Sequence, residues 1–357
     1  MKIKGCNLGG LFVTEKWITP SLYLFGSDET SLCVGMKENG MNSRSFLDNH
    51  KKRFITKADL AAMRRCGLNS VRIPVGYWIM GDEDYPDHPA LKSMRPFPAN
   101  ELAILKKVVH WAGKEGLSVM LDLHCAPGCQ NGFDNGGISG VCDWHTKPEY
   151  IDYTVDVLGR IAKTFASYSN VMGIQVLNEP RWTIPTSLLI EFYGRAYEAI
   201  RKEMPAKEVI IHDAFRDHNE FAVLSKLPGI ALDVHRYRCF NDWMRDMDFY
   251  THIRQVIVDG HDEAEDIMSI WPHAYVGEWS LGLNLNPVDK EDSRTDQEIV
   301  HSETKDPNAS FLMTAYAYAQ LIAHEPYTGS YFWTWKTEAS PEWSYSNAVK
   351  KGWIPHR

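Results

Sequence analysis

The sequence lacks any apolar run long enough to cross a membrane, since no stretch approaches the about 18 consecutive apolar residues of a transmembrane helix. Basic residues are outnumbered as well: 38 Lys and Arg stand against 46 Asp and Glu, which gives a net charge of −8. Domains that bind nucleic acids more often carry an excess of basic residues. These two absences argue against both a membrane and a nucleic acid as the partner of this protein.

Glycine loops that bind phosphates are missing too. Neither GxGxxG nor GxxxxGK[ST] follows an early apolar run, so the usual signatures of dinucleotide and nucleoside triphosphate sites are absent. The chain also has no internal repeat and no linker rich in Pro, Gly or Ser. We therefore expect one domain, spanning residues 1–357, that uses no nucleotide cofactor.

Cysteine occurs in an odd number and without the spacing of a standard metal site. The seven cysteines do not form the even framework of a small secreted domain, so free thiols are expected. Two alternatives stay open for one loop: a disulfide between Cys129 and Cys142, or a zinc site that adds Cys125. No apolar targeting segment precedes the first motif, which predicts a cytoplasmic protein, or a secreted one if a leader has been removed.

Aromatic side chains, by contrast, are plentiful, with 12 Trp, 16 Tyr and 14 Phe. Apolar residues make up 44% of the chain and charged residues 24%, which is ordinary for a soluble globular protein. Most of the aromatic residues are therefore expected in the core. A surplus of Trp also suits a protein that stacks on sugar rings.

Short apolar runs alternate with amphipathic stretches along the chain, which predicts βα units around a parallel sheet. Eight runs have the character of strands, at residues 2–8, 70–74, 118–124, 172–178, 209–213, 230–235, 274–279 and 331–335. Eight strands that alternate with helices predict an α/β fold of the (β/α)8 TIM-barrel type. An open doubly wound sheet is the competing arrangement.

The segments between these runs predict helices. Thr56 and Asp59 form a capping-box pattern, and Gly67 marks the end of that helix. Less regular helices are expected near residues 215–227 and 243–258. Others are predicted from apolar residues at helical spacing, which are Leu102, Leu105, Val109 and Ala112, then Ile151, Val155, Leu158, Ala162 and Phe165, then Leu189, Phe192, Ala196 and Ile200, and last Phe311, Ala315, Tyr318 and Ile322.

Two long polar segments, at residues 26–53 and 284–310, follow the first and the seventh predicted strands. In a barrel both would lie on the C-terminal rim, where they could wall a substrate cleft.

Polar residues stand at the C-terminal ends of most predicted strands. The reactive face of a TIM barrel lies there, and burying so many polar groups without a use would cost stability. The set comprises Arg72, Asp122, His124, Asn178, Glu179, Asp213, His235, Tyr237, Glu278 and Trp333.

Two glutamates in this set suggest a specific chemistry. Glu179 ends the fourth predicted strand and Glu278 the seventh, so in a barrel they would face each other across the mouth. Two carboxyl groups about 5–5.5 Å apart are what a retaining glycosidase needs. Glu278 would be the nucleophile if Arg72 and Tyr237 reach it, because a cation and a hydroxyl donor favour the ionised form. Glu179 would then be the acid/base.

Motifs that follow one another in order along nearly the whole chain resemble those of glycoside hydrolase family 5, and more narrowly those of the fungal-type exo-β-1,3-glucanases. The family-wide motifs are Lys4-Gly5-Cys6-Asn7-Leu8-Gly9-Gly10, Leu177-Asn178-Glu179-Pro180, Val276-Gly277-Glu278-Trp279-Ser280 and Phe332-Trp333-Thr334-Trp335. The narrower match rests on Val71-Arg72-Ile73-Pro74-Val75-Gly76-Tyr77-Trp78, Leu121-Asp122-Leu123-His124, Gln130-Asn131-Gly132-Phe133-Asp134-Asn135 and Ile211-His212-Asp213-Ala214-Phe215.

The resemblance implies a (β/α)8 barrel that hydrolyses β-glucosidic bonds with retention, without a metal or other cofactor. It implies Glu179 as acid/base and Glu278 as nucleophile. It also implies that the pocket for the terminal glucose is lined by Glu15, His124, Asp134, Asn135, Asn178, His235, Tyr237 and Trp333. Arg72 is predicted as a further substrate-binding residue. Phe133 and Phe240 match an aromatic pair that grips the next sugar at the entrance.

The function expected from the sequence is thus an exo-β-1,3-glucanase that releases glucose from non-reducing ends, acting on a β-glucan oligosaccharide or β-glucoside. The alternative within the same chemistry is a β-glucosidase for β-1,6-glucan, a steryl or lipid glucoside, or a diglycoside. A different class of protein, a silent glycan-binding barrel, is disfavoured because the carboxylate pair and its partners are intact.

Overall fold

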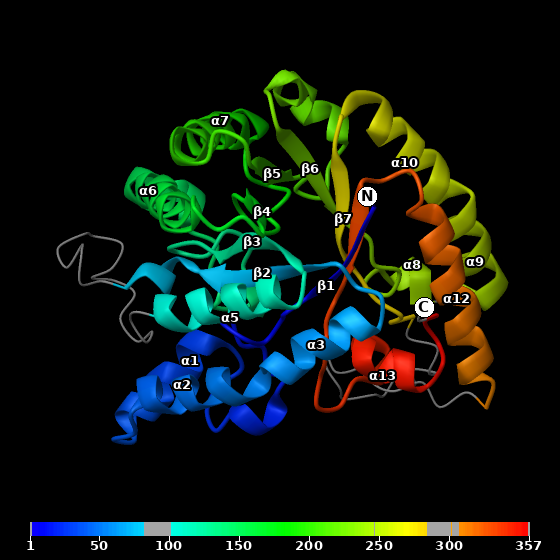
Figure 1. Cartoon of the computed structure of the whole chain (residues 1–357), viewed down its shortest axis with the longest axis horizontal. Coiled ribbons are helices and arrows are strands. Elements are labelled where there is room, and N and C mark those ends of the chain that lie inside the picture. Colours follow the sequence, from blue (N-terminus) through cyan, green and yellow to red (C-terminus); the bar gives the residue numbers. More distant parts are fainter. Residues whose placement is uncertain (1, 82–100, 246, 284–300, 302–306, 356–357) are drawn as a thin grey trace.

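The computed structural model describes residues 2–81, 101–245, 247–283, 301 and 307–355. Its centre is a closed barrel of eight parallel strands in chain order, as predicted, and helices surround it (Figure 1). The strands are β1 (Ile3–Asn7), β2 (Ser70–Gly76), β3 (Ser118–Cys125), β4 (Val171–Gln175), β5 (Glu208–His212), β6 (Ile230–His235), β7 (Ala274–Trp279) and β8 (Gly329–Phe332). The fourth and eighth predicted strands extend three residues beyond the C-terminal ends of β4 and β8. Glu179 and Trp333 therefore lie in the loops that follow these strands.

Helices form where apolar residues recur at helical spacing. Helices that lie between consecutive strands include α3 (Lys57–Arg65), α5 (Leu102–Lys114), α6 (Pro148–Phe165), α7 (Thr186–Glu203), α10 (Asp259–Ile270) and α12 (Ala309–Ala323). The capping box of Thr56 and Asp59 is present at the start of α3, and Gly67 follows that helix with a φ of 84°. The region expected at 215–227 is a 3-10 helix, His218–Lys226, and that at 243–258 divides into α8 (Asp242–Arg245) and α9 (Phe249–Ile257).

The helix predicted from Phe311, Ala315, Tyr318 and Ile322 is present as α12, but it buries a different face from the one that these residues form. Phe311 is 70% exposed and Tyr318 49%, whereas Met313 and Tyr316 are buried. The helix is apolar on nearly every side, so spacing alone does not select the face that meets the barrel. Among the described residues, no helix combines the length and the apolar character that crossing a bilayer requires.

Alternate residues of each strand point into the barrel, and they do so in layers. A lower layer is apolar and contains Met120, Ile210, Ala231 and Tyr275. Two residues further along each of these strands stand Asp122, His212, Asp233 and Gly277. The apolar layer therefore forms a floor beneath a polar one, which opens at the C-terminal ends of the strands.

The first polar segment follows β1 and packs against the loop after β3. It forms α1 (Glu29–Glu38) and α2 (Ser43–Phe54). The Glu29 carboxylate accepts hydrogen bonds from the backbone and the hydroxyl of Thr14, and the Thr30 amide donates to the carbonyl of Gly137, in the loop after β3. Of the second segment, residues 284–300 and 302–306 lie outside the described residues. His301 is described, and its ring stacks on that of Trp17 at 3.8 Å.

Candidate active site

A single buried arginine organises the polar layer of the barrel. Arg72 points inward from β2 and is fully buried. Its guanidinium nitrogens contact five polar side chains, which are those of Gln175 (2.7 Å), Asn178 (2.6 Å), Glu278 (2.8 Å), Asn7 (2.9 Å) and Asp122 (3.0 Å). Because a buried cation is stable only when it is paired and fully hydrogen-bonded, this network fixes the positions of all five.

Glu278 is the next-to-last residue of β7, and both donors considered from the sequence, Arg72 and Tyr237, reach it. Its Oε1 accepts from Arg72, and its Oε2 accepts from the Tyr237 hydroxyl at 2.7 Å. The preceding residue, Gly277, needs to be a glycine because a Cβ there would lie 2.2 Å from the Asp233 carboxylate. The absence of a side chain thus lets the Asp233 carboxylate lie against β7 beside Glu278.

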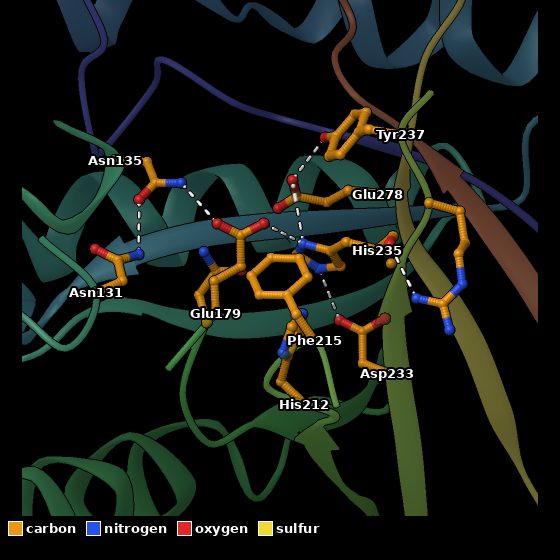
Figure 2. Close-up of polar contacts among 12 residues, drawn as sticks. Asn131, Asn135, Glu179, His212, Phe215, Asp233, His235, Tyr237 and Glu278 are labelled. Carbon is orange, nitrogen blue, oxygen red and sulfur yellow. Dashed lines mark hydrogen bonds and ion pairs between the residues drawn. The ribbon is translucent and has the colours of Figure 1, made fainter. Parts of the chain in front are cut away.

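Glu179 approaches from the other side of the mouth, in the loop after β4. Its φ of 44° is in the left-handed region, where a residue other than glycine costs about 1–3 kcal/mol. Such strain is typical of sites where a side chain must point in one direction. The Glu179 carboxylate accepts from Asn135 at 2.9 Å, and Asn135 is held in turn by Asn131. Figure 2 shows this chain of contacts.

His235 joins the two glutamates (Figure 2). Its Nδ1 lies 2.6 Å from Oε1 of Glu179 and 3.5 Å from Oε2 of Glu278. The separation of the two oxygens therefore cannot exceed the sum of these two distances. That sum is shorter than about 6.5 Å, the smallest separation of the two carboxyl groups in inverting enzymes. The geometry fits a retaining pair. The other ring nitrogen of His235 contacts Asp233 at 3.1 Å.

The sequence predicts that Arg72 and Tyr237 favour the ionised form of Glu278, but the pKa of Glu278 is raised and that of Glu179 is lowered. Burial raises the pKa of Glu278 more than His235 and Arg72 lower it. Burial also acts to raise the pKa of Glu179, but the hydrogen bond and the charge of His235 outweigh it, so the pKa of Glu179 is lowered. Burial opposes charge on His235, yet Glu278 and Asp233 raise the pKa of His235 to about 10. A pKa of about 10 favours the protonated form of His235 at neutral pH.

This raised pKa predicts a loss of stability in base. A histidine with a pKa near 6.5 when unfolded and about 10 when folded stabilises the native state fully below pH 6.5. That contribution, on the order of a few kcal/mol, declines as the pH rises from 6.5 through about 10. Urea unfolding at pH 6, 8 and 10 should show the decline in the wild type and a flatter profile in His235→Gln. Parallel profiles in the two proteins would contradict the assignment.

The predicted sugar-binding residues surround this centre. The ring of His124 bonds Asp122 at 2.6 Å and stacks on Trp333, with centroids 5.4 Å apart and planes 6° apart. The amide oxygen of Asn178 is occupied by Arg72, so the amide nitrogen, 3.5 Å from His124, is the group that can donate to a sugar hydroxyl.

Glu15 is buried, and among the described residues its Oε1 has no partner, whereas its Oε2 accepts from the Trp17 indole at 2.8 Å. Burial, followed by repulsion from Asp134, raises the pKa of Glu15 well above its ordinary value. An unpaired buried carboxyl oxygen is costly. It is available to a sugar hydroxyl.

The predicted entrance pair lies at the edge of the site. Phe240 is 49% exposed, and its ring lies 5.4 Å from that of Tyr237. Phe133 is partly buried in the loop after β3, and its ring lies 6.3 Å from that of Trp182. All thirteen predicted residues thus lie at the C-terminal mouth of one barrel.

Three residues that fix the site were missed as site residues. Asn7 and Gln175 hold Arg72, and Asp233 holds His235. The sequence contains a signal for two of them. Gln175 stands between Ile174 and Val176, and Asp233 stands between Leu232 and Val234, so each is a polar residue within an apolar run. A polar residue in a buried strand requires a partner.

Among the residues that the structure describes, two groups of side chains have the spacing of a metal site. Glu179, His212 and His235 place ligand atoms within 4.8 Å of one another. An ion there would have to displace the bond between Glu179 and His235, and Nδ1 of His212 already accepts from the Ala214 amide. The second group is His261, Asp262 and Glu265 on α10.

All seven cysteines are free thiols, including Cys125, Cys129 and Cys142, for which the sequence left a disulfide or a zinc site open.

Comparisons with known proteins agree with this geometry. A family model described as cellulase (glycosyl hydrolase family 5) matches residues 32–314. A glucan 1,3-beta-glucosidase of Blumeria graminis is 33% identical, over 99% of this chain and 87% of its own length. One of Candida oleophila is 32% identical, over 99% and 88%. The solved structure of a rutinosidase from Aspergillus niger matches with a TM-score of 0.79 over 99% of this chain and 98% of that one, at 18% identity, which shows a shared fold.

Proposed function

The chain belongs to glycosyl hydrolase family 5, and on that basis we propose that it is a retaining exo-β-1,3-glucanase, which releases glucose from the non-reducing ends of β-1,3-glucans. The observation that carries the proposal is the carboxylate pair bridged by His235. Glu179 and Glu278 lie close enough for a double displacement, and each has its own set of donors.

In the first step Glu278 attacks the anomeric carbon while Glu179 protonates the leaving oxygen. The proton reaches Glu179 along its 2.6 Å hydrogen bond from His235. Forming the glycosyl ester removes the charge of Glu278, which is the main charge that holds a proton on His235. A neutral His235 then leaves Glu179 as an anion, ready to accept a proton from water.

In the second step that water attacks the anomeric carbon and releases Glu278 as a carboxylate. The restored charge of Glu278 again favours protonation of His235, which takes up the proton that Glu179 received. His235 is thus protonated when Glu278 is an anion and neutral when Glu278 is esterified, and Glu179 alternates between acid and base.

A wall near Glu15 supports release of single glucose units. The indole of Trp17 donates to Glu15, and its ring forms a cluster with those of His301, at 3.8 Å, and Trp343, at 5.3 Å. Ser21 binds Glu338 through its amide at 2.9 Å, which joins this segment to the loop after β8. We infer that these contacts close the pocket beside the terminal sugar, which favours action on chain ends.

The proposal is tested by assaying glucose release from laminari-oligosaccharides against β-1,6- and β-1,4-linked glucose oligomers. We expect the β-1,3 series to give the highest kcat/KM, and glucose to appear first as the β-anomer in proton NMR. Initial release of the α-anomer would contradict retention. Cleavage of only aryl or lipid glucosides would contradict the glucanase assignment and favour a β-glucosidase for another aglycone.

A further inference from the structure

An exposed tryptophan stands on the same loop as Glu179 and takes no part in the chemistry described above. Trp182 is three residues beyond Glu179, and its side chain is 48% exposed. Because Glu179 is proposed to protonate the leaving oxygen, the leaving group must lie on the Glu179 side of the scissile bond. Trp182 is therefore on the side of the site that the departing part of the substrate occupies.

The segment that carries Trp182 is held rigidly. The amide of Arg181 donates to the carbonyl of Gln130 at 3.0 Å, and its guanidinium donates to the carbonyl of Asn131 at 2.8 Å. The Trp182 carbonyl accepts from Arg216. A fixed backbone lowers the entropic cost of binding, so the indole is already in place before a ligand arrives.

Exposure rises outward from the proposed reaction centre along this side of the site. Glu179 is 5% exposed, Phe133 is partly buried, and Trp182 is half exposed. The rings of Phe133 and Trp182 are 6.3 Å apart, which is about the spacing of neighbouring sugars in a chain. If Phe133 contacts the first sugar of the leaving group, Trp182 lies one sugar further out.

The surroundings of the indole suit a sugar better than a flat apolar aglycone. The Arg181 guanidinium lies over the Trp182 ring, 5.1 Å from its centroid. A glucosyl ring offers C–H groups to an aromatic face and hydroxyl groups to donors at its edge, so it uses both residues. An apolar aglycone could stack on these groups, but it would offer the guanidinium no hydrogen-bond acceptor and would partly desolvate it.

We propose that Trp182 and Arg181 form a binding subsite for the second glucosyl residue of the leaving group. This inference rests on the proposed function. It predicts that a β-1,3-linked trisaccharide is a better substrate than the disaccharide because its third sugar covers the exposed indole.

The experiment compares kcat/KM for laminaribiose and laminaritriose in the wild type and three variants. In Trp182→Ala the preference for the triose should fall about tenfold, equivalent to about 1.4 kcal/mol, while kcat/KM for the biose stays within about twofold. Trp182→Phe should retain part of the preference. The matched control is Phe311→Ala, which removes an aromatic side chain that is 70% exposed on α12, and it should match the wild type.

Each other outcome has a definite meaning. An unchanged preference in Trp182→Ala, or an equal loss for both substrates, would overturn the subsite. A loss confined to aryl glucosides with bulky aglycones would overturn it too, in favour of an aglycone platform. A wild type that cleaves neither oligosaccharide would instead refute the proposed function. Thermal unfolding of each variant, expected to be unchanged because the indole is half exposed, excludes a folding defect.

Discussion

Replacing Glu278 with glycine should abolish turnover, with a fall in kcat of about 10⁴-fold or more. The variant removes the carboxylate that attacks the anomeric carbon and leaves a space beside Arg72 and Tyr237. Azide can enter this space, attack from the same face and yield the α-glucosyl azide, which proton NMR identifies. Circular dichroism should show a native fold, because Arg72 retains its contact with Asp122 at 3.0 Å.

The control for this experiment is Glu325→Gly, which removes a carboxylate that is 71% exposed and pairs with Lys2 at the surface. It should retain wild-type activity and show no response to azide. If Glu278→Gly instead gave a β-glucosyl azide and Glu179→Ala an α-glucosyl azide, the roles of the two glutamates would be exchanged.

Replacing Glu179 with alanine should separate the two steps of the reaction. A substrate with a good leaving group, such as a dinitrophenyl glucoside, needs no protonation, so its first step should proceed at nearly the wild-type rate. The second step should be slow because no base activates water, and the product should appear in a burst followed by a low steady rate. Azide needs no deprotonation and should speed the second step, giving the β-glucosyl azide.

Natural substrates should behave differently, since their leaving group is a sugar. With laminaribiose, kcat/KM of Glu179→Ala should fall by about 10²-fold to 10⁴-fold, the range that general acid–base catalysis contributes. Glu179→Gln preserves the shape of the side chain and should be equally impaired. A Gln variant with wild-type activity on laminaribiose would show that Glu179 does not transfer the proton.

The barrel and its reactive face could be predicted because they depend on local pattern. Eight apolar runs alternate with helical spacing, and such strands end in polar residues only where a barrel has its mouth. Glu179 and Glu278 follow from that rule, and the contacts of Arg72 and Tyr237 with Glu278 confirm the expected neighbours. The same reasoning predicts a structural role for Gln175 and Asp233, because they are polar residues within buried strands.

Other features depend on groups that meet only in the folded chain. The pKa of Glu278 was expected to be lowered by its donors, but burial outweighs them, and no pattern in the sequence measures burial of one side chain. The bond from His235 to Glu179 joins β6 to the loop after β4, across 56 residues of sequence. The sequence did not predict Trp182 as a binding residue, because the proposed subsite depends on the exposure of its side chain and on its distance from Phe133.

The sequence by itself determined the strand count, the parallel barrel and the presence of two carboxylates at its C-terminal end, because these follow from side-chain periodicity, which is a property of neighbouring residues. The tertiary structure alone decided which residue holds the proton, which face of α12 is buried and which aromatic side chains stay open to a substrate. Desolvation and charge–charge contacts set those outcomes, and they arise between residues that the chain order keeps far apart.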